Sequence, residues 1–271
     1  MMRIPTILTA FAALALTACS GNGAEEPADP APTGGATVTP AKDKPDLLLF
    51  TSLPIVWGEG GLKDILKSQE EPHWARTALE SRYDLTPLDT PVALKPPGLL
   101  LMAQPRALSA QENVALDDFV RGGGLALLIV DPMLDVESKY GLGDKRRPEA
   151  ISMLSPILAR WGLRLVADKD RNPRTARWND NSFTVEDPGH FEPIEGGHES
   201  TCTFASDNLI ATCSVGAGRV MLLGDATFLA ESHAEPAAET GESGAGENAG
   251  ERGDTLLFRL LDTLQTAPKA D

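Results

Sequence analysis

Uninterrupted apolar runs alternate with helix-like spacing between residues 46 and 268. A strand buried on both faces produces such a run, whereas an amphipathic helix places apolar residues three and four positions apart. The strand-like runs are residues 46–51, 98–103, 125–130, 163–166 and 219–223. Helical spacing is found at residues 62–66, 74–79, 109–121, 148–161 and 254–264. This alternation predicts a single α/β domain over residues 46–268, with a mostly parallel, flavodoxin-like sheet and helices on both faces.

The helix expected at residues 109–121 has the clearest end signals. Ser109 stands at the N-cap and Glu112 at the third helical position, a pair that forms a capping box. Three consecutive glycines, beginning at Gly122, are expected to end the helix. The apolar positions expected to face the core are Val114, Leu116, Phe119 and Val120.

The beginning of the chain has the pattern of an export signal. Arg3 precedes an apolar stretch, residues 7–16, that is too short for a membrane-spanning helix. The run Leu16-Thr17-Ala18-Cys19 resembles the lipobox of bacterial lipoproteins, which implies cleavage of residues 1–18 and attachment of lipid to Cys19. The alternative is an ordinary signal peptide with a chance cysteine. Ser20 stands where the inner-membrane retention signal has aspartate, so the resemblance implies a periplasm-facing protein and favours the outer membrane.

Two segments are expected to be disordered. Residues 19–45 contain almost no large apolar side chain and cannot offset their ordering entropy, so they read as a lipid-anchored tether. Residues 231–253 hold six glutamates and one arginine without any Leu, Ile, Val or aromatic residue, which is typical of a disordered acidic insert. The formal net charge of −15 argues against nucleic acid and against anionic lipid headgroups as partners.

Lipidation of Cys19 would leave two cysteines, Cys202 and Cys213. The segment between them is typical of two short strands joined by the turn pair Asp207-Asn208. A hairpin with that turn places the two cysteines opposite each other, within reach of a disulfide, which an oxidising compartment favours. The alternatives are free buried thiols and a zinc site with His190 or His198, whose spacing fits no standard zinc pattern.

Polar residues follow the expected parallel strands at their carboxyl ends, where α/β sheets bind ligands. They are Thr51, Ser52, Gln104, Asp131 and Asp225. An aspartate in such a place can bind a ligand or a metal, but it also commonly caps its own turn. Trp57, just after the first strand, reads as a partner anchor or as a core residue. No catalytic constellation, phosphate-binding loop or metal-ligand spacing is present, so neither cofactor nor metal is expected.

Two stretches resemble one known family. The first begins at residues 99–105, continues through Leu108-Ser109-Ala110-Gln111-Glu112 and residues 115–125, and ends at Asp131-Pro132. The second is Gly224-Asp225-Ala226-Thr227-Phe228-Leu229 with the following residues 254–264. Both are similar to the auxiliary, gliding-motility-type component of uncharacterised ABC transport systems. The resemblance implies a class I glutamine-amidotransferase-like fold used for binding, with a permease or ATPase assembly as the partner.

Together the patterns favour a non-enzymatic, lipid-anchored periplasmic domain that binds a small ligand or a partner protein, as an accessory of an ABC transport system. The residues expected at the binding rim are Ser52, Trp57, Gln104, Asp131 and Asp225. The alternative is a cell-envelope hydrolase that uses Asp131 and Asp225. Paired-carboxylate chemistry requires the two groups to lie within about 10 Å of each other across an open pocket. Carboxylates buried in turns would favour the binding module.

Replacing the lipidation residue tests the predicted anchor. Cys19→Ala should leave the protein free in the periplasm or as uncut precursor, because the lipid on this cysteine supplies the anchor. Labelling with radioactive palmitate should mark the wild type and not the variant. A wild-type protein that takes up no label would show that the lipoprotein interpretation is wrong.

Overall fold

The computed structural model describes residues 44–58, 72–230 and 253–266. The predicted signal peptide, Cys19, the helix expected at residues 62–66 and the acidic segment before Gly253 lie outside the described residues, as does the expected tether up to residue 43. Among the described helices, none combines the length and the apolar character that a membrane crossing requires.

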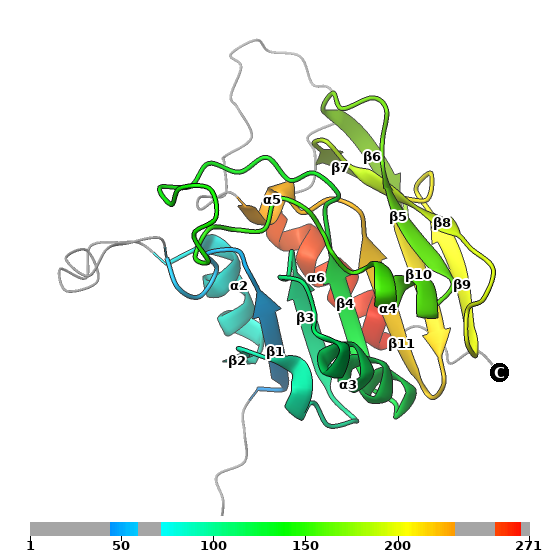
Figure 1. Cartoon of the computed structure of the whole chain (residues 1–271). Coiled ribbons are helices and arrows are strands. Elements are labelled where there is room, and N and C mark those ends of the chain that lie inside the picture. The colour runs from blue at the N-terminus through cyan, green and yellow to red at the C-terminus, as the bar shows by residue number, and fades with distance from the viewer. Residues whose placement is uncertain (1–43, 59–71, 231–252, 267–271) are drawn as a thin grey trace, which may run out of the picture. The chain divides into compact units, whose positions relative to one another are not determined.

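A seven-stranded sheet forms the centre of the fold (Figure 1). The strand order is β2-β1-β3-β4-β11-β10-β9. The first five strands are parallel, and β10 and β9 are antiparallel additions beyond β11. Their bounds are β1 Asp46–Thr51, β2 Asp84–Pro87, β3 Leu99–Ala103, β4 Leu125–Ile129, β9 Ser200–Ala205, β10 Ile210–Val215 and β11 Gly218–Leu223. The five parallel strands follow the flavodoxin-like order, so the predicted fold class is confirmed.

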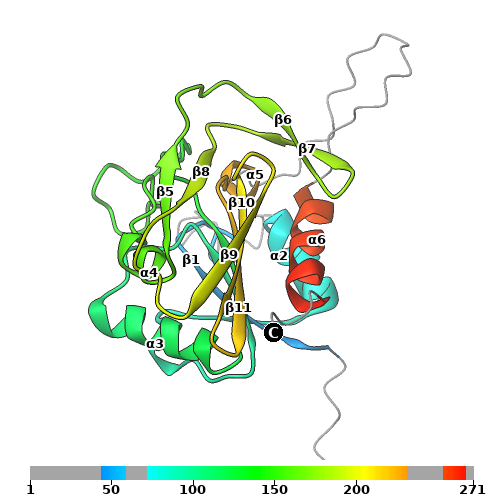
Figure 2. The same cartoon turned by 90° about the vertical axis from the view of Figure 1, so that its right-hand side faces the viewer.

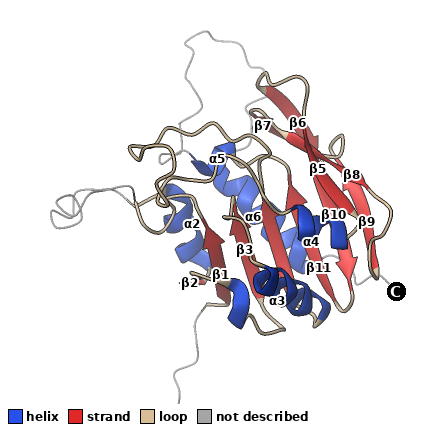
Figure 3. Cartoon of the chain, viewed as in Figure 1, coloured by secondary structure: helices blue, strands red, loops and turns tan. Residues whose placement is uncertain are grey.

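Helices cover both faces of the sheet, as Figure 3 shows. The helices α2 (Trp74–Arg82) and α6 (Gly253–Thr266) pack on one face, and α3 (Ala110–Arg121) and α4 (Ser155–Arg160) pack on the other. Alternate residues of each strand serve the two cores: Leu99 and Leu101 of β3 face the first, while Leu100 and Met102 face the second. Burial of each such side chain contributes about 1.5–3 kcal/mol, which explains why these strands are apolar at consecutive positions.

The end signals of α3 form the predicted contacts. The Ser109 hydroxyl accepts a hydrogen bond from the Glu112 backbone N–H at 3.2 Å, and the Glu112 carboxylate accepts one from the Ser109 N–H at 2.8 Å. Gly122 caps the other end. The prediction that Val114 faces the core is wrong: its side chain is 59% exposed, on the outer side of the helix.

Between residues 148 and 167 the expected start of the helix is wrong, and the expected strand is confirmed but lies outside the main sheet. The helix begins only at Ser155, since the backbone of residues 149–152 bonds instead to groups at the ends of β1 and β4. The strand at 163–166 exists as β5 (Leu163–Ala167), but it pairs with β8 (Gly189–Pro193) in a separate two-stranded antiparallel sheet. A further hairpin contains β6 (Arg174–Trp178) and β7 (Asn181–Val185). The edge strand β2 was missed because its four residues, of which none is fully buried, have no strong pattern.

The cysteine hairpin has the predicted register. Cys202 of β9 lies opposite Cys213 of β10, and a disulfide joins them with 4.0 Å between the Cα atoms. This pairing excludes both alternatives, the free thiols and a zinc site built on these cysteines. The turn differs from the expectation: it contains residues 206–209, and Ser206, Asp207 and Asn208 all have positive φ angles. The register is unchanged because the longer turn is centred on the same two residues.

Removal of the disulfide should lower stability without changing the fold. The closed loop is short, so Cys202→Ala with Cys213→Ala is expected to cost about 2–3 kcal/mol, which corresponds to a melting temperature lower by about 4–12 °C. Thermal unfolding of the oxidised wild type, the reduced wild type and the double variant measures this cost. If reduction leaves the melting temperature of the wild type unchanged, the bond does not stabilise the hairpin.

Candidate functional site

Four of the five predicted rim residues lie at one edge of the sheet. Ser52, Gln104, Asp131 and Asp225 lie within two residues of the carboxyl ends of β1, β3, β4 and β11, which are adjacent strands. Asp131 and Asp225 each stand two residues beyond the last register pair of their strands, Ile129 with Leu223. The prediction that the parallel topology brings these side chains to a common edge is therefore correct in geometry.

Gln104 connects the ends of three strands. Its side-chain amide donates hydrogen bonds to the carbonyls of Asp131 at 3.1 Å and Glu149 at 3.0 Å, and its side-chain oxygen accepts one from the Asp131 N–H at 2.8 Å. The residue is fully buried and has a φ angle of 38°. A left-handed backbone costs a non-glycine residue roughly 1 kcal/mol or more. The hydrogen bonds of the amide offset this cost and use its polar atoms inside the protein.

The hydroxyl groups at the end of β1 are also used internally. Ser52 Oγ donates to the Gln104 carbonyl at 2.5 Å and accepts from the Glu149 N–H at 2.9 Å. Thr51 Oγ1 donates to the Ala103 carbonyl at 2.6 Å and accepts from the Leu53 N–H at 2.9 Å. These bonds connect β1 to β3, and among the described residues neither hydroxyl is hydrogen-bonded to a base that could activate it as a nucleophile.

Both strand-end aspartates cap their own turns. Asp131 Oδ1 accepts a hydrogen bond from the Met133 N–H at 2.7 Å, and Asp225 Oδ1 accepts one from the Thr227 N–H at 2.8 Å. Asp225 Oδ2 accepts a further bond from the Glu186 N–H at 2.7 Å. Asp131 Oδ2 is buried without a well-formed hydrogen bond to the described residues. The turn-capping interpretation therefore accounts for the positions of both aspartates.

Burial raises the pKa of both carboxyl groups. The pKa of Asp131 rises to about 7, mainly through desolvation, with the N–H of Met133 opposing the rise and the charge of Asp225 adding to it. Desolvation also raises the pKa of Asp225 to about 6, against the N–H groups of Thr227 and Glu186. Both residues are almost completely buried, since Asp131 is 0% and Asp225 2% exposed.

The segment between β4 and α4, residues 132–154, covers this edge of the sheet. We call it the edge segment. It crosses the carboxyl ends of β4, β3 and β1 (Figure 1), held by the buried side chain of Leu134 and by hydrogen bonds of Glu149 and Ser152 to the strand ends. Beside it the chain approaches so closely that a Cβ atom on Gly224 would lie 2.5 Å from the Gly189 carbonyl oxygen. No substrate can reach the aspartates in this arrangement.

The outer side of this edge carries exposed apolar side chains. Seven large hydrophobic residues are exposed in the part of the chain that the structure describes, and four of them lie in the edge segment. A fifth is Trp57, 78% exposed, on the loop after β1 that the segment contacts through Ser52. Its placement agrees with a partner anchor and not with a core residue. The four in the edge segment are Met133, Leu142, Ile151 and Met153.

Sequence reasoning missed these four residues because residues 148–154 were assigned to a helix and the preceding residues carried no predicted element. The frequency of large apolar residues in a segment rich in turn-forming and charged residues was the available signal.

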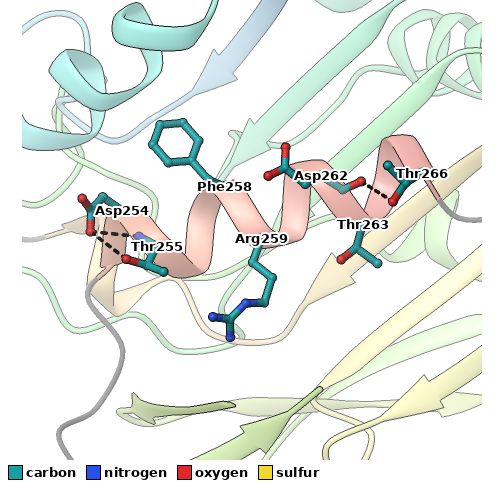
Figure 4. Close-up of a pocket in the computed structure, with 7 residues that line it drawn as sticks. All are labelled: Asp254, Thr255, Phe258, Arg259, Asp262, Thr263 and Thr266. Carbon is teal, nitrogen blue, oxygen red and sulfur yellow. Dashed lines mark hydrogen bonds between the residues drawn. The ribbon is translucent and has the colours of Figure 1, made fainter. Parts of the chain in front are cut away.

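Two surface hollows lie elsewhere. One, of about 420 Å³, runs along α6, and Figure 4 shows that all seven side chains lining it come from this single helix. Within it Asp262 pairs with Arg82 at 2.6 Å, and the Arg82 guanidinium lies 4.5 Å from the Phe258 ring centre. The other, of about 590 Å³, lies between β6 and the β9–β10 turn. Neither includes a predicted rim residue.

Histidine and acidic side chains do not assemble a metal site in the described ranges. His190 contacts Asp168 through Nδ1 at 2.5 Å and Glu192 through Nε2 at 3.4 Å. The two carboxylates therefore lie at opposite ring nitrogens and do not converge on one point.

Comparison with known proteins identifies the family that the sequence resembles. The model of the family described as "ABC-type uncharacterized transport system" matches residues 48–177. Residues 48–177 are therefore similar to this family. The match includes most of β1 and the whole of β3, α3, β4 and the edge segment, so the resemblance to an ABC transport auxiliary component is confirmed there. The second resembling stretch, residues 224–229 with 254–264, lies outside the match. No curated protein matches the chain.

Solved structures share only a weak likeness. An exo-β-1,4-mannosidase from an Opitutaceae bacterium is 14% identical, with a TM-score of 0.38, and the match covers 69% of this chain and 32% of that one. A β-galactosidase from Rahnella sp. R3 is 8% identical, with a TM-score of 0.43, and the match covers 84% of this chain and 32% of that one. A putative ThuA-like protein from Bacteroides uniformis is 11% identical, with a TM-score of 0.34, and the match covers 69% of this chain and 85% of that one. The chain spans about a third of the length of the two glycosidases.

The buried aspartates make stability depend on pH. Their pKa values are raised on folding from about 4 in the unfolded chain. The stabilisation from protonated Asp131 is therefore full below about pH 4 and is lost as the pH rises through about 7. Asp131→Asn keeps the oxygen that accepts from Met133 and removes the charge. We expect this variant to be more stable than the wild type at pH 8 by more than about 1 kcal/mol, or about 2–4 °C in melting temperature.

Melting curves between pH 4 and pH 8 test this expectation. The gain should shrink toward pH 4, and Asp118→Asn, at an exposed aspartate of α3, should show no such pH-dependent gain. A destabilised Asp131→Asn at pH 8 would mean that the charged carboxylate is favoured by its surroundings.

Proposed function

We propose that this protein is a non-enzymatic accessory component of an ABC transport system, held at the cell envelope by lipid on Cys19, which binds a protein partner through the outer surface of the edge segment. The family match over residues 48–177 supports the accessory role. The lipobox-like sequence before Cys19 supports the anchor, and the export signal supports a periplasm-facing location, with the outer membrane favoured by Ser20.

The observation that carries this proposal is the covered carboxyl edge of the sheet. In open α/β sheets the ligand site lies outside the carboxyl ends of the strands. Here the polar groups at those ends bond to one another and to the edge segment, and the aspartates have no access to solvent. The hydrolase hypothesis with Asp131 and Asp225 lacks an open pocket, so the geometry supports the binding role.

The exposed apolar residues indicate what binds there. Exposed apolar surface marks protein interaction sites, whereas small-molecule sites are concave, and four of the five exposed residues at this edge lie on one segment of 23 residues. Trp57 is suited to act as an anchor because tryptophan is enriched among the residues that dominate binding energy at interfaces. A permease or ATPase subunit of the transport system is the partner that the family match suggests.

Co-purification with matched surface variants tests the proposal. Tagged full-length protein is cross-linked in native membranes and recovered, and ABC permease and ATPase subunits are identified by mass spectrometry. The variant Trp57→Ala/Leu142→Ser/Ile151→Ser should reduce their recovery at least about tenfold, because hot-spot residues of this kind contribute most of the binding energy. The control Val92→Ser/Val114→Ser changes exposed apolar residues away from the edge segment and should leave recovery unchanged.

Two results would contradict the proposal. Failure of the wild type to recover any ABC subunit would contradict the accessory role. Equal recovery by the edge variant and the wild type would show that the edge segment is not the binding surface.

A further inference from the structure

The last strand of the main sheet, β9, has one open side. In the strand order it is terminal, and β10 is its sole partner among the described strands. Figure 1 places it at the outer end of the sheet, and Figure 2, which views the molecule from that side, shows it in front of β10 and β11. An edge of this kind presents backbone donors and acceptors that another strand can use.

The disulfide identifies which backbone groups face outward. Paired cysteines whose Cα atoms are as close as the 4.0 Å seen here occupy a non-hydrogen-bonded position of an antiparallel pair. The N–H and C=O of Cys202 therefore point away from β10. The alternation along a strand gives Ser200 and Phe204 the same orientation. Outside the strand ladders, no backbone–backbone hydrogen bond of the described residues uses the N–H or C=O of these three residues.

The sequence of β9 carries no protection against strand addition. Natural edge strands are commonly protected by lysine, by proline or by a bulge. The six residues of β9 include neither a charged residue nor a proline, and the register with β10 is continuous, so no bulge interrupts it. Thr201 and Thr203 are exposed, and β-branched residues such as these favour a strand. The disulfide holds the strand in place on β10.

We propose that β9 pairs antiparallel with β9 of a second copy of this chain, about a two-fold axis at Cys202. In this register Cys202 lies opposite its symmetry mate and Ser200 lies opposite Phe204, so all three outward-facing residues form hydrogen bonds. Thr201 then lies opposite Thr203 of the other copy, an arrangement in which threonine side chains interact favourably. The two seven-stranded sheets become continuous. Two-fold dimers with such self-complementary interfaces are the commonest oligomers.

Charges near β9 permit this pairing. The strand itself is uncharged, and the register places Asp207 opposite Gly197, beside His198, so no carboxylate lies opposite another. The net charge of −15 opposes association only over long range, and salt at about 0.15 M screens it beyond roughly 8 Å. The proposal depends on neither the lipid anchor nor the transport partner.

Paired substitutions at the two threonines test both the dimer and its register. The full chain is purified in detergent, and sedimentation equilibrium measures its association. Thr201→Lys/Thr203→Lys places like charges opposite each other twice in the proposed dimer, so the dissociation constant should rise about 5- to 30-fold. Thr201→Lys/Thr203→Glu places opposite charges there and should restore dimerisation to near the wild-type level. Both variants change the same exposed side chains.

Folding is checked independently of association. All three proteins should contain the Cys202–Cys213 disulfide by thiol titration and give the same circular dichroism spectrum. A wild type that remains monomeric at about 100 μM would overturn the proposal, since a stable interface is expected to associate at micromolar concentrations. Dimers of equal affinity in the wild type and both variants would also overturn it, because they would form through another surface.

Discussion

Gln104 connects the carboxyl ends of three parallel strands, through its side chain to the end of β4 and through its backbone carbonyl to the end of β1. Strands end there with backbone groups that no neighbouring strand can bond, and the site is buried. An unpaired buried donor or acceptor costs about 1–3 kcal/mol. The Gln104 amide bonds both backbone groups of Asp131 and the carbonyl of Glu149, and its own carbonyl accepts from Ser52. These bonds offset the cost of the left-handed backbone at Gln104, whose φ angle is 38°.

This constraint determines how the protein can use its fold. A flavodoxin-like sheet usually leaves a crevice at the carboxyl ends of its strands for a ligand. In this protein the edge segment occupies that place, with Leu134 in the core and Glu149 and Ser152 bonded to the strand ends. The two carboxyl groups at this edge, those of Asp131 and Asp225, are buried and accept hydrogen bonds from their own turns. A partner can instead contact the outer surface of the edge segment, where the segment exposes apolar side chains.

The opposite end of the sheet is built differently. Beyond β11 the sheet continues with β10 antiparallel to β11 and β9 antiparallel to β10, and a disulfide joins β9 to β10. The parallel part depends on two cores, one on each face, with α6 contributing Leu256, Leu257, Leu260, Leu261 and Leu264 to the first. At the antiparallel end, the last strand β9 is not covered on both faces, since its Thr201 and Thr203 side chains are exposed. The two ends of one sheet therefore offer separate surfaces, an apolar edge and an open strand.

The sequence by itself determined the elements whose signals are local. Continuous apolar runs identified β1, β3, β4 and β11, the capping box identified α3, and the centre of the turn set the register of Cys202 and Cys213. The polar residues at the strand ends were also found, because a parallel topology brings all such ends to one edge. Only the tertiary structure decided what those residues do. Whether Asp131 is open or buried depends on the path of residues 132–154, whose hydrogen-bond partners Ser52 and Gln104 are distant in sequence. No local pattern records such contacts, and the same contacts replaced the first half of the expected helix at residues 148–161.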